Sequence, residues 1–217
     1  LAGMAEDGRR RRQGLTPPAS RFIGREADLA ALRALFEQGA RLVTLWGPAG
    51  MGKTRLSLQV VLAWVEARPE ESVWVAELAE ARDLEALCSV VARTLEIDLV
   101  GARSGAALVE QIGRFLAAQG PALLVVDNLE QVVEEAAPAL DRWIRMAPEL
   151  RLLATSRERC RIAGEVGYEL SPLSLPRGEE TRGEAVELFL DRVRGKRPGL
   201  ALGDESVGAI GTLVCRL

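Results

Sequence analysis

The chain has 217 residues, of which 48% are hydrophobic and 27% charged, and its formal net charge at pH 7 is −3. This length and composition indicate a soluble globular protein with one large domain, or one domain and a fragment of another. The sequence has no histidine, which excludes Ser-His-Asp and Cys-His catalysis and every metal site with histidine ligands. The small net charge gives no general attraction toward nucleic acid or membranes.

The cysteines and the apolar runs indicate the compartment. Cys88, Cys160 and Cys215 are odd in number and far apart in the sequence, which suits ordinary core or surface side chains in a reducing compartment. No apolar run approaches the roughly 20 residues that span a bilayer, and the N-terminus lacks the charged-then-apolar order of a signal peptide. We therefore expect a cytoplasmic protein without membrane contacts.

The first 20 residues are predicted to be a flexible linker. They contain the one strong basic cluster, Arg9 to Arg12, in a stretch rich in glycine, proline and arginine without hydrophobic periodicity. A patch that binds nucleic acid or directs localisation is the alternative interpretation. Because the rest of the chain has no other basic run and no recognition-helix motif, we expect no direct binding of nucleic acid.

Strand and helix patterns alternate along the following residues. In chain order we predict a strand at 41–46, a helix at 54–68, a strand at 72–78, helices at 83–95 and 104–120, a strand at 121–128, a helix at 130–146 and a strand at 151–156. Asp83 and Ser104 are the expected N-caps of the two middle helices. This alternation predicts an α/β fold in which helices flank a parallel sheet.

A glycine-rich loop joins the first predicted strand to the first predicted helix. Its sequence fits GxxxxGK[ST], a pattern that cradles phosphate groups between a strand and a helix. The glycines let backbone N–H groups turn inward toward an anion at the positive end of the helix. Lys53 is expected to reach the β and γ phosphates, and the Thr54 hydroxyl to ligate Mg²⁺. A compact lysine suits this loop better than the planar arginine fork, although the chain contains only one other lysine, Lys196.

Acidic side chains near the end of the strand at 121–128 are candidates for the catalytic chemistry. Asp127 ends a buried strand at the carboxyl edge of the predicted sheet and is expected to hold Mg²⁺ through water. Its neighbour Asn128 is not the carboxylate that would orient an attacking water, so fast hydrolysis is not expected. Glu130 is the candidate substitute, with an ordinary first-turn helix residue as the alternative.

An arginine follows the strand at 151–156. The guanidinium of Arg157 would contact the γ-phosphate and distinguish ATP from ADP. The predicted catalytic side chains are Lys53, Asp127, Glu130 and Arg157. The predicted phosphate-binding residues are Gly47, Pro48, Ala49, Gly50, Met51, Gly52, Lys53, Thr54 and Arg55.

Several segments in a fixed order resemble the STAND class of signal-transducing P-loop ATPases. They are FIGREADLAALRAL, LVTLWGPAGMGKTRLSLQVV, SVWVAEL, LLVVDNLEQV, LRLLATSRE, and LSPLSLP followed by EAVELFLDRVR, within residues 21–217. They are similar to the nucleotide-binding modules of large bacterial transcription regulators of the LuxR and antibiotic-regulator type, relatives of NB-ARC modules. The resemblance implies that Phe22, Ile23, Gly24 and Arg25 lie against adenine and ribose, with Arg157 as the sensor. From the residues alone, Phe22 and Ile23 are equally well core anchors.

The resemblance also suggests a domain organisation and a function. Residues 21–175 would form the P-loop α/β domain and residues 176–217 a truncated helical subdomain, with helices at 179–195 and 204–217. The implied function is an ATP/ADP switch with slow Mg²⁺-dependent hydrolysis that controls an attached effector, in transcription regulation. Its partners would be ATP or ADP, the effector and sensor domains of a longer polypeptide, and further copies of itself in a nucleotide-dependent assembly. The alternatives are a P-loop enzyme with substantial ATPase or phosphotransferase turnover, and an interaction scaffold whose nucleotide is structural or absent.

Overall fold

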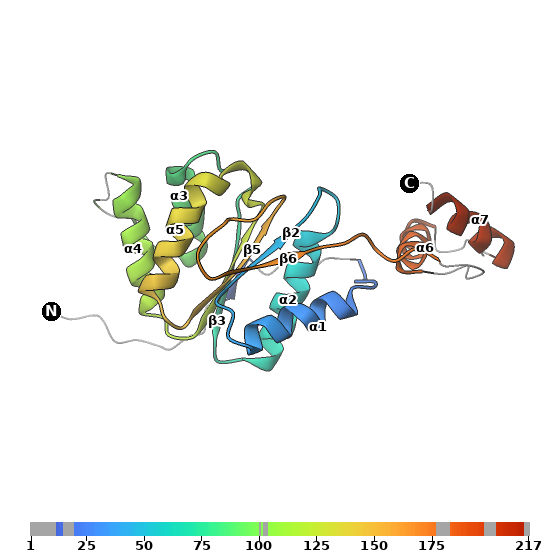
Figure 1. Cartoon of the computed structure of the whole chain (residues 1–217), viewed down its shortest axis with the longest axis horizontal. Helices are drawn as coiled ribbons and strands as arrows, with labels where there is room; N and C mark the ends of the chain where they lie inside the picture. The colour runs from blue at the N-terminus through green and yellow to red at the C-terminus, as the bar shows by residue number, and fades with distance from the viewer. Residues whose placement is uncertain are drawn as a thin grey trace.

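A parallel six-stranded sheet forms the centre of the molecule (Figure 1). The structure, a computed structural model, describes residues 12–14, 20–99, 101, 104–176, 183–197 and 203–214. In sheet order the strands are β1 (Arg12–Gln13), β3 (Ser72–Glu77), β4 (Ala122–Asp127), β5 (Leu150–Ser156), β2 (Leu42–Trp46) and β6 (Glu165–Glu169). Every neighbouring pair is parallel, so the predicted α/β fold is confirmed.

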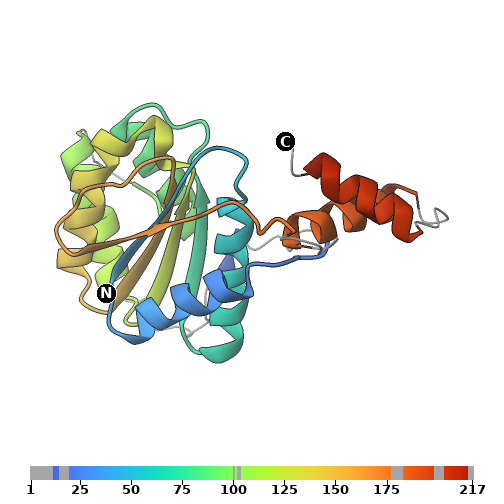
Figure 2. The same ribbon diagram turned by 45° about the vertical axis from the view of Figure 1, so that its right-hand side comes forward.

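Helices cover both faces of this sheet (Figures 1 and 2). One face carries α1 (Glu26–Glu37) and α2 (Lys53–Ala67), and the other carries α3 (Leu84–Leu95), α4 (Gly105–Ala117) and α5 (Val133–Met146), with a 3-10 turn, η1 (Leu129–Gln131), before α5. A helix pair, α6 (Glu184–Lys196) and α7 (Asp204–Val214), stands apart from these layers. Within the described residues, no helix is long and apolar enough to cross a membrane.

The central strand β4 explains why its sequence is a continuous apolar run. All six of its residues are buried, because helices pack on both faces of the sheet. Leu124 and Val126 belong to the core under α3, α4 and α5, whereas Leu123 and Val125 belong to the core under α1 and α2. The alternation of side chains along a strand thus places successive residues of one run in two different cores.

Two helix starts follow the predicted capping chemistry. The Asp83 carboxylate accepts the Ala86 N–H at 2.7 Å, and the Ser104 hydroxyl oxygen accepts the Ala107 N–H at 3.4 Å. Both predicted N-caps are confirmed. The helix predicted at 130–146 begins later, at Val133, because the chain first passes through the left-handed residue Asn128 (φ 63°) and the turn η1.

Both edge strands were absent from the sequence prediction. β6 has glutamates at both ends and a glycine at its centre, and it pairs only with β2 among the described strands. Its alternating apolar residues, Val166 and Tyr168, pack against the core under α1 and α2, but two such residues around a glycine are a weak strand signal. The two residues of β1 pair with Val73 and Trp74 of β3. They lie within the segment predicted to be a flexible linker, most of whose other residues lie outside the described residues, so the linker stays a prediction.

Two of the three cysteines lie in the interior, as ordinary core side chains. Burial raises the pKa of Cys88 to about 12 and that of Cys160 to about 11, so both are unreactive thiols near neutral pH. The Thr44 hydroxyl lies 3.7 Å from the Cys160 sulfur. Cys215 lies outside the described residues.

Candidate functional site

The glycine-rich loop lies between β2 and α2, as its pattern requires. Gly50 and Gly52 have φ values of 80° and 86°, a left-handed conformation that side chains other than glycine rarely adopt. An added Cβ at either residue would meet no atom within 4 Å, so the backbone conformation, and not crowding, requires glycine here. Gly52 is the N-cap of α2, and the loop therefore presents free N–H groups at the positive end of that helix.

Lys53 begins α2 and folds back over the loop. Its side chain is nearly buried, with 7% exposure. The ammonium donates hydrogen bonds to the carbonyls of Gly47 and Pro48, each at 2.9 Å. Both acceptors are neutral, so the charge of Lys53 remains available to an anion held by the loop.

Asp127, at the end of β4, is joined to the start of α2. The Thr54 hydroxyl donates to its Oδ2 at 2.8 Å, and the Thr155 hydroxyl donates to its Oδ1. Asp127 is 2% exposed, and this burial raises its pKa, although the two hydroxyls and Lys53 act in the opposite direction. A carboxylate and a hydroxyl thus lie together beside the phosphate-binding loop.

Thr155 is a residue that the sequence reasoning did not identify. It lies near the end of β5, is fully buried, and accepts the Asn128 N–H at 3.0 Å while donating to Asp127. Its hydroxyl therefore fixes both the Asp127 carboxylate and the turn that follows β4. Two hydroxyl residues, Thr155 and Ser156, at the end of the apolar run LLA were the available signal, because buried polar groups require partners.

Glu130 and Arg157, predicted separately, lie side by side. Arg157 Nε is 3.3 Å from Glu130 Oε1, with the Arg157 side chain 59% and the Glu130 side chain 16% exposed. Within the described residues, the second carboxylate oxygen of Glu130 is buried without a hydrogen-bond partner. Glu130 lines a cavity of about 470 Å³ together with Gly50, Lys53, Thr54 and Asn128. Glu130 therefore borders the space in front of the glycine loop, and Arg157 is joined to that space through Glu130; contact of Arg157 with a γ-phosphate stays a prediction.

A second, mainly apolar cavity of about 580 Å³ adjoins the first. Phe22, Ile23, Met51, Leu173 and Leu188 are among its lining residues. Gly50, Gly52 and Arg55 line both cavities, so the two spaces meet at the glycine loop. Phe22 also packs against the core under α1 and α2, as expected of a core anchor. It lines the apolar cavity as well, so its contact with a nucleotide base stays a prediction.

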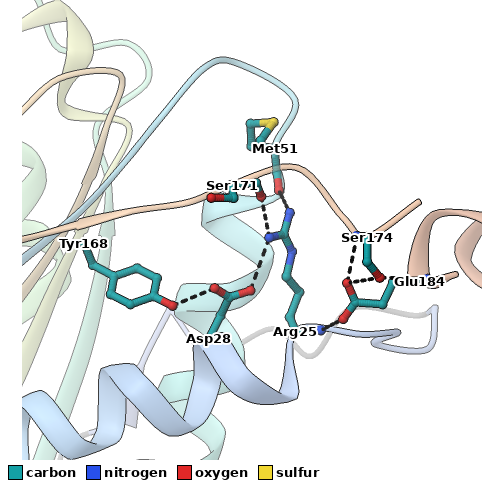
Figure 3. A network of polar contacts seen from close by, with 7 residues as sticks. All are labelled: Arg25, Asp28, Met51, Tyr168, Ser171, Ser174 and Glu184. Carbon is teal, nitrogen blue, oxygen red and sulfur yellow. Dashed lines mark hydrogen bonds and ion pairs between the residues drawn. The ribbon is translucent and has the colours of Figure 1, made fainter. Parts of the chain in front are cut away.

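Arg25 lines the apolar cavity. Its guanidinium donates hydrogen bonds to other groups of the protein (Figure 3). It donates to the carbonyls of Ser171 (2.6 Å) and Met51 (3.2 Å) and to the Asp28 carboxylate (3.2 Å). Its neighbour Gly24 does not line either cavity and instead approaches Glu184. Contact of these two residues with a base or ribose stays a prediction.

Sequence comparison finds related proteins that are longer than this chain. The sequence profile of the family described as "AAA domain" matches residues 36–163, more than half of the chain. An uncharacterised protein of Mycobacterium bovis is 33% identical over 196 residues, which cover 90% of this chain and 47% of that protein. A Mycobacterium tuberculosis protein, provisionally named an HTH-type transcriptional regulator, is 31% identical over 186 residues, 86% of this chain and 20% of that protein. The chain thus spans about half or less of the length of these curated relatives.

Solved structures with low sequence identity share the fold. The Aeropyrum pernix ORC1 protein, solved in complex with DNA, matches 91% of this chain and 56% of its own, with a TM-score of 0.64 and 20% identity. A STAND protein with a tetratricopeptide repeat sensor from Pyrococcus horikoshii matches 94% of this chain and 30% of its own, with a TM-score of 0.52 and 18% identity. The parallel sheet, the phosphate-binding loop and above all the family match show that this chain belongs to the AAA family of P-loop ATPase domains.

Proposed function

We propose that this chain is the nucleotide-binding module of an NB-ARC-like, STAND-type switch, which binds ATP or ADP together with Mg²⁺. The observation that carries this proposal is the meeting of two cavities at the glycine loop. The cavity beside Lys53 has an ammonium and the start of α2 in its wall and suits phosphates, and the more strongly apolar cavity beside Phe22 suits a flat aromatic base. Together they match the two chemically different halves of a nucleotide.

Thr54 and Asp127 fit the requirements of a magnesium ion. They supply a hydroxyl and a carboxylate oxygen 2.8 Å apart, and Mg²⁺ is ordinarily held by one or two protein oxygens, waters and substrate phosphates. Within the described part of the chain, no group of three or more His, Cys, Asp or Glu side chains is placed to hold a metal by itself. When bound, the ion would be shared with the nucleotide and would offset the charge of its phosphates.

The difference between ATP and ADP would be read at Arg157. This arginine is half-exposed and forms an ion pair with Glu130, which lines the cavity beside Lys53. A γ-phosphate offers Arg157 a charge-assisted contact that ADP does not. The resulting difference in free energy would bias the arrangement of the attached domains. Similarity to a much longer protein, provisionally named an HTH-type transcriptional regulator, supports an effector that acts in transcription.

Appreciable ATP hydrolysis is the second candidate function. It is favoured by Glu130, whose second carboxylate oxygen is buried without a partner in the described structure and which lines the phosphate cavity. A carboxylate in this position could orient a water for attack on the γ-phosphate. The rate of phosphate release, compared between the chain and its Glu130→Gln variant, separates a turning-over ATPase from a slow switch.

Calorimetric titration of ATP and ADP, each with Mg²⁺, tests the proposed function. We expect micromolar binding to the chain and a loss of at least about tenfold in affinity in Lys53→Ala, because a charge-assisted contact with the phosphates is removed. Lys196→Ala, which changes the other lysine of the chain at the end of α6, is the matched control and should bind like the unmodified chain. Absence of binding by the unmodified chain at millimolar nucleotide would contradict the proposal.

A further inference from the structure

Helix α6 supplies one wall of the apolar cavity. Ala185, Leu188 and Arg192 line it from the helix, and their spacing of three and four residues places them on one face. Phe22, Ile23 and Met51 line the cavity from the N-terminal segment and the glycine loop. The width of the cavity therefore depends on how α6 is seated against residues that are far from it in the sequence.

The first residue of α6, Glu184, joins these two sides (Figure 3). Its Oε1 accepts the backbone N–H of Arg25 at 2.9 Å. Its Oε2 accepts the backbone N–H and the hydroxyl of Ser174, at 3.0 and 2.9 Å. The N–H groups of Ser174 and then of Arg25 are the largest causes that lower the pKa of Glu184, which keeps it ionised near neutral pH. One carboxylate thus connects α6, the segment before it and the start of α1.

Arg25 continues this connection to the glycine loop. Its backbone N–H is held by Glu184, while its guanidinium donates to the Met51 carbonyl of the loop and to the Ser171 carbonyl. Asp28 accepts from the guanidinium and also from the Tyr168 hydroxyl, at 2.6 Å. The guanidinium is nine-tenths buried, with 8% of its side chain exposed, so Arg25 has a defined position between the loop and α6.

Gly24 allows the close approach that this contact requires. Its φ is +68°, and a Cβ added there would lie 2.8 Å from Glu184 Oε1. A side chain at this residue would therefore both strain the backbone and push the carboxylate away. The sequence around Arg25 is thus suited to receive the carboxylate of α6.

We propose that Glu184 is a positioning residue that seats α6 as a wall of the apolar cavity, so that binding of a nucleotide base and seating of the α6–α7 pair stabilise each other through Arg25. This inference rests on the proposed function for the identity of the ligand, but the seating of α6 is measurable without any ligand. We call the contacts of Glu184 with Arg25 and Ser174 the seat of α6. Because coupling between two equilibria is reciprocal, bound nucleotide should slow hydrogen exchange of α6 by the same factor by which complete loss of the seat weakens nucleotide binding.

Hydrogen exchange of α6 and calorimetry with Mg²⁺–ADP test this inference on the whole 217-residue chain. In Glu184→Gln, which keeps the size of the side chain but loses an acceptor and the charge, we expect α6 amides to exchange at least about tenfold faster and ADP affinity to fall about tenfold. Gly24→Ala should produce the same pair of effects with Glu184 intact. Exchange in β4, remote from the seat, reports whether each variant remains folded.

Two comparisons give the experiment its controls. Glu187→Gln neutralises an exposed carboxylate in the same turn of α6 and should change neither quantity. Lys53→Ala should lose nucleotide affinity while α6 exchanges normally without ligand, which distinguishes failure of the phosphate site from failure of the seat. Unchanged α6 exchange in Glu184→Gln would overturn the inference, and so would faster exchange with unchanged ADP affinity. If the unmodified chain binds no ADP, the proposed function fails and the seat is judged by ligand-free exchange alone.

Discussion

Glu130 and Arg157 form an ion pair across the ends of two neighbouring strands, with 3.3 Å between Oε1 and Nε. Glu130 lies in the turn after β4, and Arg157 follows β5 directly. The arginine that would read a γ-phosphate is therefore already held by the carboxylate that would orient a water. A γ-phosphate near Lys53 must compete with Glu130 for Arg157, and both anions would repel each other.

Removal of the arginine should affect one nucleotide more than the other. We expect Arg157→Ala to lower ATP affinity about tenfold and to leave ADP affinity almost unchanged, because only ATP has the phosphate that Arg157 would contact. Calorimetry with both nucleotides measures the difference. Arg145→Ala is the control, since Arg145 is likewise an exposed arginine paired with a carboxylate, Asp141, but lies in the last turn of α5. Equal losses for ATP and ADP in Arg157→Ala would contradict a sensor role.

Neutralising the carboxylate of the pair should have opposite effects on binding and on hydrolysis. Glu130→Gln frees Arg157 and removes a negative charge beside the phosphate cavity, so ATP affinity should rise several-fold. Any hydrolysis that depends on Glu130 as a base should fall by about 100-fold or more. Calorimetry and phosphate release measure the two effects. A variant that hydrolyses ATP at the original rate would show that Glu130 is only the partner of Arg157.

Thr155 should affect the affinity of the site for Mg²⁺ although it is not a predicted ligand of the ion. Thr155→Val removes the hydroxyl that donates to Asp127 and accepts from Asn128, so the carboxylate loses its fixed orientation. Loss of such an outer partner typically costs about 10- to 100-fold in metal affinity, and we expect the Mg²⁺ concentration needed for tight ATP binding to rise by that factor. Thr155→Ser keeps the hydroxyl and should restore the original magnesium dependence. Equal behaviour of the valine and serine variants would show that the hydroxyl has no such role.

The sheet and the phosphate-binding loop were predictable from local patterns. The strands ending at Trp46 and Asp127 are short apolar runs. The pattern GxxxxGK[ST] predicts a phosphate-binding loop when it lies between a strand and a helix. The caps at Asp83 and Ser104 are equally local, since each side chain bonds to an N–H three residues later. These features need no information about distant parts of the chain.

Contacts between distant segments were not predictable in the same way. The Glu130–Arg157 pair, the Thr155 hydroxyl on Asp127 and the Glu184 carboxylate on Arg25 depend on which strands become neighbours and on where α6 lies. Arg25 shows the consequence: its guanidinium donates to carbonyls from two other segments, which no local pattern indicated, while the nucleotide contact implied by the family resemblance stays a prediction. The edge strand β6 was missed because its five residues include two glutamates and a glycine, so that only Val166 and Tyr168 indicate a strand.

The ionised Asp127 carboxylate should reduce the stability of the protein at neutral pH, although it is the proposed partner of Mg²⁺. Burial raises its folded pKa above the ordinary value near 3.8, so the stability that it contributes is present below that value and is lost as the pH rises through the folded pKa. Asp127→Asn keeps the size of the side chain, loses the charge and replaces one of the two acceptor oxygens by an NH2 group. Without nucleotide and Mg²⁺, we expect this variant to melt above the original chain at pH 7.5, with a difference that shrinks toward pH 4 because the carboxyl group becomes protonated in the original chain. Glu77→Gln is the matched control, since Glu77 is exposed at the paired position of β3 and should show no such trend. Thermal melts across this pH range measure the difference, and a lower melting temperature of Asp127→Asn at pH 7.5 would mean that the hydroxyls of Thr54 and Thr155 stabilise the carboxylate by more than its burial costs.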